Sequence, residues 1–378
     1  MSRPSPTRDR ARHARQMILA EVGAAGQQRI RAGRVLVIGA GGLGSPALLY
    51  LAGAGVGTIG IVDDDAVDLS NLHRQVVHRS DLVGEPKTAS AAAALRALDP
   101  DLEVVEHRVH LDASTAPELL AGYDLVVDGA DNFPTRYAVS AACHAARLPH
   151  VWGSVLGFRG QASVWGVGDG PCYRCAFPDP PPAGSVPSCA EGGVMGPVCA
   201  AIGSTQAMEA LKLLMGVGTA LSGTVLVHDA LTQSWDRVPV ARDPDCPGCG
   251  RSPRPPQDPE PAGALPTRRP AELVLPVEAA RRLAGTADAP LLLDVRTAAE
   301  RELVRIPGSI HVPLADLEGE PGRAVRESDR RVIVHCASGG RSAQAAAALQ
   351  AQRHGREIRD LAGGIVAWEQ AGLPVEPA

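Results

Sequence analysis

Short runs of hydrophobic residues alternate with Ala- and Leu-rich helical stretches through the first 150 positions of the chain. Such runs, rich in β-branched side chains, are typical of buried parallel strands. We expect helical segments at 8–32, ending at Gly33, and at 194–216. The alternating part predicts strands at 34–38, 58–62, 103–107 and 125–128, and helices at 45–54, 87–98 and 136–147. This order predicts an α/β fold with a doubly wound, mostly parallel sheet.

A glycine-rich turn follows the first predicted strand. Gly39, Gly41, Gly42 and Gly44 let the backbone turn sharply and approach a ligand closely. The helix that follows offers unpaired N–H groups and a partial positive charge, for which a phosphate is a natural partner. Asp63 ends the second apolar strand and is well placed for a ribose hydroxyl. The pattern predicts a nucleotide site, but NAD, FAD and ATP all fit it.

Two cations lie between the acidic ends of the predicted strands. Arg74 stands in LSNLHRQ (69–75) and Lys87 in GEPK (84–87), while Asp131 and Asn132 follow the fourth strand. Either cation alone could be an ordinary surface residue. Cleavage of a triphosphate builds charge on the phosphates and needs cationic partners, which a dehydrogenase does not. The pair therefore favours ATP over a nicotinamide cofactor.

Four of the eight cysteines form two CxxC pairs. Cys172 and Cys175 make the first pair, and Cys246 and Cys249 the second. Two such pairs in a cytosolic protein predict a tetrahedral zinc site with a structural role, because four thiolates leave no open position. Cys189 stands alone in a Pro- and Gly-rich loop and is either a nucleophile or incidental.

Proline and charge dominate residues 251–272, which we interpret as a linker between domains 1–250 and 273–378. The second domain shows a smaller α/β pattern. One of its apolar strands runs directly into Cys336, a small-residue loop, Arg341 and an Ala-rich helix. A ring of backbone N–H groups at a helix start depresses a thiol's pKa and holds an anion. This loop is one residue shorter than the phosphate-sized loop of cysteine phosphatases, and suits a single sulfur atom.

Composition and charge narrow the function classes. The chain has 378 residues, 45% of them hydrophobic and 21% charged, with a net charge of −5. This balance gives no basic surface for nucleic acid. No apolar run reaches the roughly 20 residues of a membrane helix, and the basic front end lacks the apolar core of a secretory signal. We expect a cytoplasmic protein without nucleic-acid or membrane partners. Cys143 and Cys199 fall in apolar helical stretches and are expected in the core.

Taken together, the motifs resemble two known families. Residues 12–250 resemble the MoeB/ThiF family of adenylyltransferases, relatives of the ubiquitin-activating enzymes with a Rossmann-like fold. Residues 273–378 resemble a rhodanese sulfurtransferase domain, and the fusion resembles MoeZ-type proteins. The first resemblance rests on the CxxC pairs and on RHARQ (12–16), GAGGLG (39–44), DLSNLHRQ (68–75), GEPK (84–87), DGADN (128–132) and SCAEGGVMGP (188–197). The second rests on DVR (294–296), IPGSIHVPL (306–314), CASGGRS (336–342) and GGIVAWEQAGLPV (363–375).

The resemblance implies a two-step chemistry. A ubiquitin-like sulfur-carrier protein would present its C-terminal Gly-Gly carboxylate to the α-phosphate of ATP, with Mg²⁺ bound, giving an acyl-adenylate and pyrophosphate. A persulfide on Cys336 would attack this adenylate. Cys189 would then release the carrier as a thiocarboxylate, through a thioester or by forming a disulfide. The sulfur donor, a cysteine desulfurase or thiosulfate, leaves no motif, and neither does the pathway, which could serve molybdenum-cofactor synthesis or a related sulfur transfer.

Site residues carry over position by position. In the family, the arginine that matches Arg15 reaches the neighbouring subunit's site, which implies a homodimer. Many rhodanese domains have His where this chain has Arg305, so we expect a changed surface there. The catalytic set would be Cys189, Cys336, Arg74, Lys87, Asp131, Arg15 and Arg341. The nucleotide set would be Gly39, Gly41, Gly42, Gly44, Asp63, Ser70, Asn71, Leu72, His73, Arg74, Lys87, Asp131 and Asn132. Two alternatives remain, an NAD(P)-dependent oxidoreductase and a non-catalytic scaffold.

Overall fold

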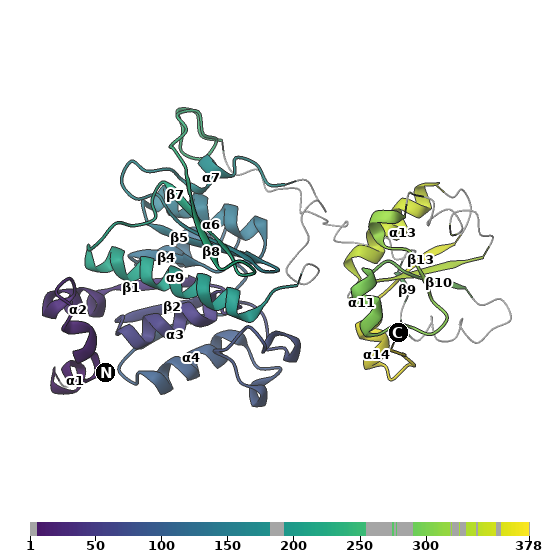
Figure 1. The fold of residues 1–378 in the computed structure, drawn as a ribbon, viewed down its shortest axis with the longest axis horizontal. Coiled ribbons are helices and arrows are strands. Elements are labelled where there is room, and N and C mark those ends of the chain that lie inside the picture. Colours follow the sequence, from purple (N-terminus) through teal and green to yellow (C-terminus); the bar gives the residue numbers. More distant parts are fainter. Residues whose placement is uncertain are drawn as a thin grey trace. The chain divides into compact units, whose positions relative to one another are not determined.

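The computed structural model describes residues 6–181, 193–254, 274–275, 277, 290–317, 319, 325, 330–337, 339–352 and 357–377. The chain divides into two compact units, Met1–Pro259 and Glu260–Ala378 (Figure 1). Residues 251–254 of the expected linker still belong to the first unit, because the Arg254 N–H donates to the Pro247 carbonyl at 2.9 Å. Residues 255–272 of the expected linker lie outside the described residues.

An eight-stranded sheet forms the centre of the first unit, in the order β3-β2-β1-β4-β5-β6-β7-β8. The strands from β3 to β5 run parallel, and those from β5 to β8 are antiparallel. The strands are β1 (Arg34–Ile38), β2 (Thr58–Val62), β3 (Glu103–His107), β4 (Leu125–Asp128), β5 (His150–Leu156), β6 (Arg159–Trp165), β7 (Thr224–Asp229) and β8 (Ser234–Pro239). The doubly wound parallel part is confirmed, and the antiparallel extension is an addition to it.

Helices cover this sheet, and two of their boundaries differ from expectation. The segment expected as one helix over 8–32 is two helices, α1 and α2, separated by residues 18–22. Helix α6 begins at Phe133 rather than 136 because the Asn132 side chain caps it, accepting from the Thr135 N–H. The helices are α1 (Pro6–Met17), α2 (Gly23–Ala32), α3 (Gly44–Ala54), α4 (Lys87–Leu98), α5 (Ala116–Leu120), α6 (Phe133–Ala146), α7 (Tyr173–Ala176) and α9 (Gly196–Met215), with short 3₁₀ turns η1 (Leu69–Asn71) and η2 (Ser80–Leu82).

Strand β1 shows why the sheet is hydrophobic on both faces. Val35 and Val37 belong to one core cluster, with side chains of α3 and α9. Leu36 and Ile38 belong to another, with side chains of α5 and α6. Because successive strand residues point to opposite faces, a strand covered on both sides must be apolar throughout. The carboxyl ends of β1, β2 and β4 are left to form a site.

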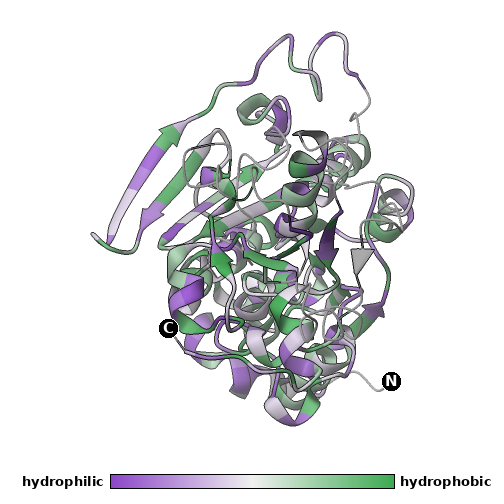
Figure 2. Cartoon of the chain, turned by 90° about the vertical axis from the view of Figure 1, so that its right-hand side faces the viewer, coloured by the Kyte–Doolittle hydropathy of each residue, from purple (hydrophilic) through white to green (hydrophobic). Residues whose placement is uncertain are grey.

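The second unit is a smaller α/β domain, as expected. Its five strands are parallel, in the order β11-β10-β12-β13-β9. They are β9 (Val274–Leu275), β10 (Leu291–Asp294), β11 (Ile310–His311), β12 (Val332–His335) and β13 (Ile358–Leu361), with helices α11 (Ala298–Leu303), α13 (Gly340–Gln352) and α14 (Gly364–Gln370) and the 3₁₀ turn η3 (Leu314–Asp316). The helices mix hydrophilic and hydrophobic residues (Figure 2), and within the described residues none is long and apolar enough to cross a membrane.

Candidate functional site

A cavity of about 350 Å³ opens in the first unit at the carboxyl ends of the parallel strands. Strand β1 has β2 on one side and β4 on the other, so the chain crosses over in opposite directions here. Ligands of doubly wound sheets bind at this switch point. Eight of the predicted nucleotide residues line the cavity, namely Gly39, Gly41, Gly42, Asp63, Arg74, Lys87, Asp131 and Asn132.

The glycines of the turn after β1 have different structural roles. Gly39 has a φ of +81°, which L side chains rarely adopt. A Cβ on Gly44 would lie 1.8 Å from the Gly39 carbonyl oxygen. Gly44 therefore serves close packing of α3 against the turn and does not itself line the cavity. A Cβ on Gly42 would lie 2.9 Å from the Sγ of Cys199, a buried thiol of α9 that also lines the cavity.

Asp63 at the end of β2 holds the glycine turn in place. Its Oδ2 accepts the Ala40 N–H at 2.8 Å, and its Oδ1 accepts the Asp65 N–H at 2.9 Å. Burial raises the pKa of Asp63, while the nearby Lys87 and these two N–H groups oppose the rise. The carboxylate thus both orders the turn and offers acceptor oxygens to the cavity.

Two cations reach the cavity, each held by a neighbouring side chain. Lys87 begins α4, is 6% exposed, and places its Nζ 2.7 Å from the Asp65 Oδ2. The Arg74 Nη2 donates to the Asn71 Oδ1 at 2.6 Å. Asn71 consequently acts on the cavity through Arg74. The other three members of the predicted loop set do not line the cavity, namely Ser70, Leu72 and His73.

Asp131 and Asn132 divide their roles at the mouth of the cavity. The Asn132 Oδ1 is committed to the helix cap, accepting the Thr135 N–H at 2.9 Å. Its Nδ2 lies 3.5 Å from the Asp131 Oδ1. Asp131 is exposed and lines the cavity, so its carboxylate is the group of this pair that can bind a cation.

Sequence reasoning missed two residues that line the cavity. Gln75 is 5% exposed, and its Oε1 has no hydrogen-bond partner among the described residues. Because buried polar atoms are normally paired, this oxygen is a candidate acceptor for a ligand in the cavity. Arg136 of α6 donates from Nε to the Ala130 carbonyl at 3.1 Å. Their only sequence signals were adjacency to Arg74 and to the DGADN segment.

A buried layer beneath the cavity fixes the turn after β4. The Asp128 Oδ1 accepts the Ala130 N–H at 2.9 Å, and its Oδ2 lies 2.9 Å from the His150 Nε2. The Gln206 Nε2, from α9, donates to the Asp128 carbonyl at 2.7 Å. These bonds connect β4, β5 and α9, so the residues that follow Asp128 are held on a rigid base.

Arg15 is not brought to this cavity. Arg15 is exposed on α1 and does not line it. Residues beside it connect α1 to the rest of the first unit: the Arg12 Nη2 donates to the Leu98 carbonyl at 2.6 Å, and the Gln16 Nε2 to the Ala54 carbonyl at 2.8 Å. Cys189 lies outside the described residues.

The four cysteines of the CxxC pairs come together, with their Sγ atoms all within 4.8 Å of one another. Cys172 and Cys246 are 3.6 Å apart at sulfur, and Cys175 and Cys249 are 3.5 Å apart. Tetrahedral Zn²⁺ with bonds of about 2.3 Å sets its sulfurs about 3.8 Å apart. Arg174 closes the site, donating from Nη1 to the Pro247 carbonyl at 3.2 Å. The donor set and its spacing fit a zinc ion.

Cys336 lies at the end of β12 in the second unit, only 1% exposed. Its Sγ accepts the Gly339 N–H at 3.1 Å and the Ser342 hydroxyl at 3.3 Å. Gly364 packs so closely that a Cβ there would lie 2.4 Å from the Cys336 carbonyl oxygen. Two donors are therefore directed at the sulfur of the loop.

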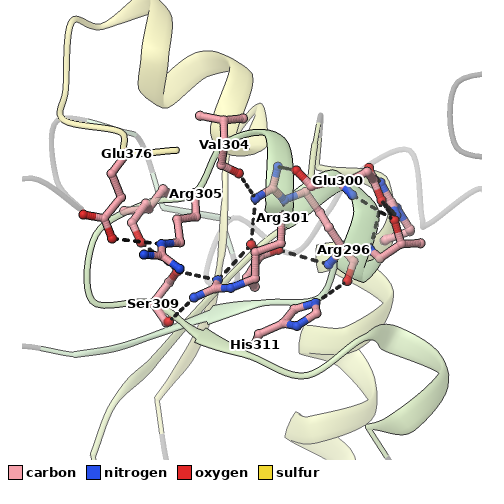
Figure 3. A network of polar contacts seen from close by, with 12 residues as sticks. Arg296, Glu300, Arg301, Val304, Arg305, Ser309, His311 and Glu376 are labelled. Atoms are coloured by element: carbon pink, nitrogen blue, oxygen red, sulfur yellow. Dashed lines mark hydrogen bonds and ion pairs between the residues drawn. The ribbon is translucent and has the colours of Figure 1, made fainter. Parts of the chain in front are cut away.

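Arg341 is bound to a neighbouring acid. Its Nη1 and Nη2 donate to the two carboxylate oxygens of Glu300 at 2.8 and 2.6 Å. Figure 3 shows Glu300 within a polar network of α11 that also includes Arg296 and Arg301. Burial alone would raise the pKa of Glu300, but bonds from Arg341 and Thr297 outweigh it and bring it to about 2.

Arg305, the departure from many rhodanese sequences, forms an ion pair at the edge of the same network (Figure 3). Its Nε lies 2.9 Å from the Glu376 Oε1, and their backbones exchange two hydrogen bonds of 2.9 Å. Arg305 therefore connects the C-terminal segment to the domain.

Comparison with known proteins gives the family. The ThiF family model matches residues 13–248, and the rhodanese-like domain model matches residues 276–371. The chain is 43% identical to a probable adenylyltransferase/sulfurtransferase MoeZ of Mycobacterium tuberculosis, over 96% of this chain and 94% of the relative. It is 50% identical to a sulfur carrier protein adenylyltransferase of Thermus thermophilus, over 64% of this chain and 91% of the relative.

A solved structure agrees on the fold. Crystalline MccB of E. coli with MccA-N7isoASN superposes with a TM-score of 0.58 at 21% identity, covering 63% of this chain and 74% of MccB. The oxidoreductase alternative is not favoured by any of these matches. The chain belongs to the ThiF family and, with its rhodanese-like domain, is an adenylyltransferase and sulfurtransferase.

Proposed function

We propose that this enzyme adenylates the C-terminal carboxylate of a ubiquitin-like sulfur-carrier protein ending in Gly-Gly and then converts it to a thiocarboxylate. One observation supports the first step above all. Arg74 and Lys87 line the same switch-point cavity as the glycine turn and Asp63. A cavity with two cations beside a phosphate-binding turn suits ATP cleavage, in which negative charge accumulates on the leaving pyrophosphate.

Residue roles follow from position in the cavity. The turn at Gly41 and Gly42 would hold the phosphates, and Asp63 the ribose. Arg74, kept in place by Asn71, and Lys87 would neutralise charge as the carrier carboxylate attacks the α-phosphorus and pyrophosphate leaves. Lys87 would leave Asp65 for the phosphates, since carboxylate and phosphate compete for one ammonium group.

Asp131 would bind Mg²⁺ at the phosphates. Its exposed carboxylate offers the hard oxygen that Mg²⁺ prefers, whereas the Asn132 oxygen already caps α6. When bound, the ion supplies positive charge to the phosphate oxygens. Asn132 would act by fixing the orientation of Asp131.

Sulfur transfer would use Cys336. Its persulfide would attack the acyl carbon of the adenylate and release AMP, which leaves the carrier joined to Cys336 through an acyl disulfide. The Cys189 thiolate would then attack the Cys336 Sγ, which forms a Cys189–Cys336 disulfide and releases the carrier as its thiocarboxylate. On the thioester route, Cys189 would first displace AMP from the adenylate, and the Cys336 persulfide would attack that thioester to give the same acyl disulfide. Both routes need a thiol reductant for each turnover. A cysteine desulfurase or thiosulfate would reload Cys336.

The four-cysteine cluster would hold a structural Zn²⁺. The sulfur spacing supports this, and four thiolates leave no position open for substrate. Thiols kept reduced in this way point to a cytoplasmic location.

A homodimer would complete the ATP site. Arg15 is exposed and lies away from its own cavity, while its helix is anchored by Arg12 and Gln16. A cation on a fixed helix that faces solvent is suited to reach a second copy of the chain.

Exchange of labelled pyrophosphate into ATP tests the adenylation step. We expect exchange only when a Gly-Gly-ended carrier is present, and a loss of about 100-fold or more for Asp131→Ala, the size of effect that a lost electrostatic partner of a transition state produces. Asp81→Ala is the matched control, because Asp81 pairs with Arg79 on the surface and does not line the cavity. Exchange that ignores the carrier would contradict the proposal.

A further inference from the structure

Glu300 and Arg341 form a bidentate ion pair beside the sulfur-bearing loop. Two hydrogen bonds of 2.8 and 2.6 Å join the guanidinium to both carboxylate oxygens. The Arg341 side chain is only 12% exposed and the Glu300 side chain 25%, so solvent screens the pair weakly. Bidentate pairs of this kind are among the strongest in proteins. The positive charge of Arg341 is thus neutralised by a partner within the protein.

Arg341 lies in the first turn of α13, which follows the Cys336 loop. The donors to the Cys336 Sγ come from Gly339, two residues before Arg341, and from Ser342, the residue after it. We therefore expect a net charge on Arg341 to influence an anion that approaches this thiol. With Glu300 ionised, the pair contributes no net charge. An anion at this loop is then attracted by the Gly339 N–H and the Ser342 hydroxyl.

We propose that Glu300 is a specificity-determining residue of the sulfurtransferase domain, which lowers the affinity for doubly charged sulfur donors by neutralising Arg341. The favoured donor is a persulfide, which carries at most one negative charge at its transferable sulfur, and not the thiosulfate dianion. This deepens the proposed function by naming the donor class. Glu300 touches no reacting atom and acts through Arg341.

Thiosulfate itself is the probe. The Cys336 thiolate attacks its outer sulfur, the new S–S bond forms, the old one breaks, and sulfite leaves with the electron pair. Cyanide then removes the outer sulfur as thiocyanate and regenerates the thiolate. The assay uses the full chain and needs neither ATP nor carrier, so it stays readable even if the proposed carrier chemistry fails.

Glu300→Gln is the informative substitution. The amide oxygen can still cap Thr297, as the Glu300 carboxylate does at 2.9 Å from the Thr297 N–H, but the charge is gone. We expect the KM for thiosulfate to fall about tenfold and kcat to change less than about twofold, since one unpaired positive charge acts on a dianion. The gain should shrink at high salt and vanish in Glu300→Gln/Arg341→Gln.

Glu376→Gln is the matched control. It removes the acid of the Arg305 pair in the same domain, at 2.9 Å, without touching the loop. Its KM for thiosulfate should equal that of the unmodified enzyme. An equal fall in KM for Glu376→Gln, or an unchanged KM for Glu300→Gln, would overturn the proposal, and so would a failure of Glu300→Gln to accept sulfur from thiosulfate.

Alkylation gives a second readout that needs no turnover. Iodoacetate is an anion and iodoacetamide is neutral, so the ratio of their rates at the Cys336 peptide reports the charge near the sulfur. We expect this ratio to rise several-fold in Glu300→Gln and to return to its starting value in the double variant. A change in loop geometry alone would alter both rates together and leave the ratio unchanged, which would count against the charge mechanism.

Discussion

At the scale of single residues, several side chains in the first unit serve another residue rather than a ligand. Asn71 supports Arg74, Asn132 caps α6, and Asp63 holds the Ala40 N–H. Substitutions of these residues should therefore act by displacing their neighbours. Gly42 serves a neighbour in a different way, because the absence of a side chain leaves space for the Cys199 sulfur.

Gly42→Ala should destabilise the first unit by about 1–3 kcal/mol, the usual cost of overpacking. The new Cβ would lie 2.9 Å from the Cys199 Sγ and 3.5 Å from its Cβ. Cys199→Ala removes that sulfur, so the double variant should recover most of the lost unfolding free energy, measured by denaturant titration. Strictly additive losses would show that the clash with Cys199 is not the cause.

At the scale of elements, the second unit links two helices by charge. Glu300 lies on α11 and Arg341 in the first turn of α13, and Glu300 also completes the cap of α11 with Thr297. One carboxylate thus holds the start of α11 and the helix that follows the Cys336 loop. Its protonation should loosen both.

The stability that Glu300 contributes should decrease as the pH falls. The pKa of Glu300 falls from its ordinary 4.5 to about 2 in the folded protein. Its stabilising effect is therefore complete above about pH 4.5 and is lost as the pH falls towards 2. We expect the difference in unfolding midpoint between the unmodified enzyme and Glu300→Gln to shrink over this interval in scanning calorimetry. A difference that is constant from pH 5 to pH 2 would show that the carboxylate charge does not stabilise the pair.

The strands and helices were largely predictable because their signals are local. The four strand intervals before residue 130 match β1 to β4. Strands β1, β2 and β4 are mainly apolar and buried, whereas the edge strand β3 reads EVVEH and is partly exposed. Strand β8 of the antiparallel extension was not predictable because it is mostly exposed and reads SWDRVP, without an apolar pattern. The break after Met17 also escaped, because the helical pattern continues through it.

Contacts between side chains far apart in the sequence were harder to predict than the motifs that contain them. The gathering of four cysteines followed from their spacing, but the Glu300–Arg341 pair joins residues 41 positions apart. No spacing rule predicts such a pair. The same holds for Gln206, which supports the Asp128 turn from 78 positions away. Pairwise chemistry across the fold was therefore the part that required the structure.

At the scale of the whole molecule, two units carry two separable chemistries. The cation-lined cavity and the four-cysteine cluster belong to Met1–Pro259, and the Cys336 loop belongs to Glu260–Ala378. Each unit has a hydrophobic core of its own. Loss of the Cys336 thiol should consequently leave adenylation intact while it stops sulfur transfer.

Intact-mass spectrometry of a Gly-Gly-ended carrier, incubated with ATP, a persulfide donor and this enzyme, tests the central claim most directly. We predict that the carrier gains the mass of one sulfur replacing one oxygen. With Cys336→Ser, the carrier should be recovered without sulfur, although pyrophosphate exchange continues. A carrier that acquires sulfur without ATP, or equally well with Cys336→Ser, would contradict the coupling of adenylation to sulfur transfer.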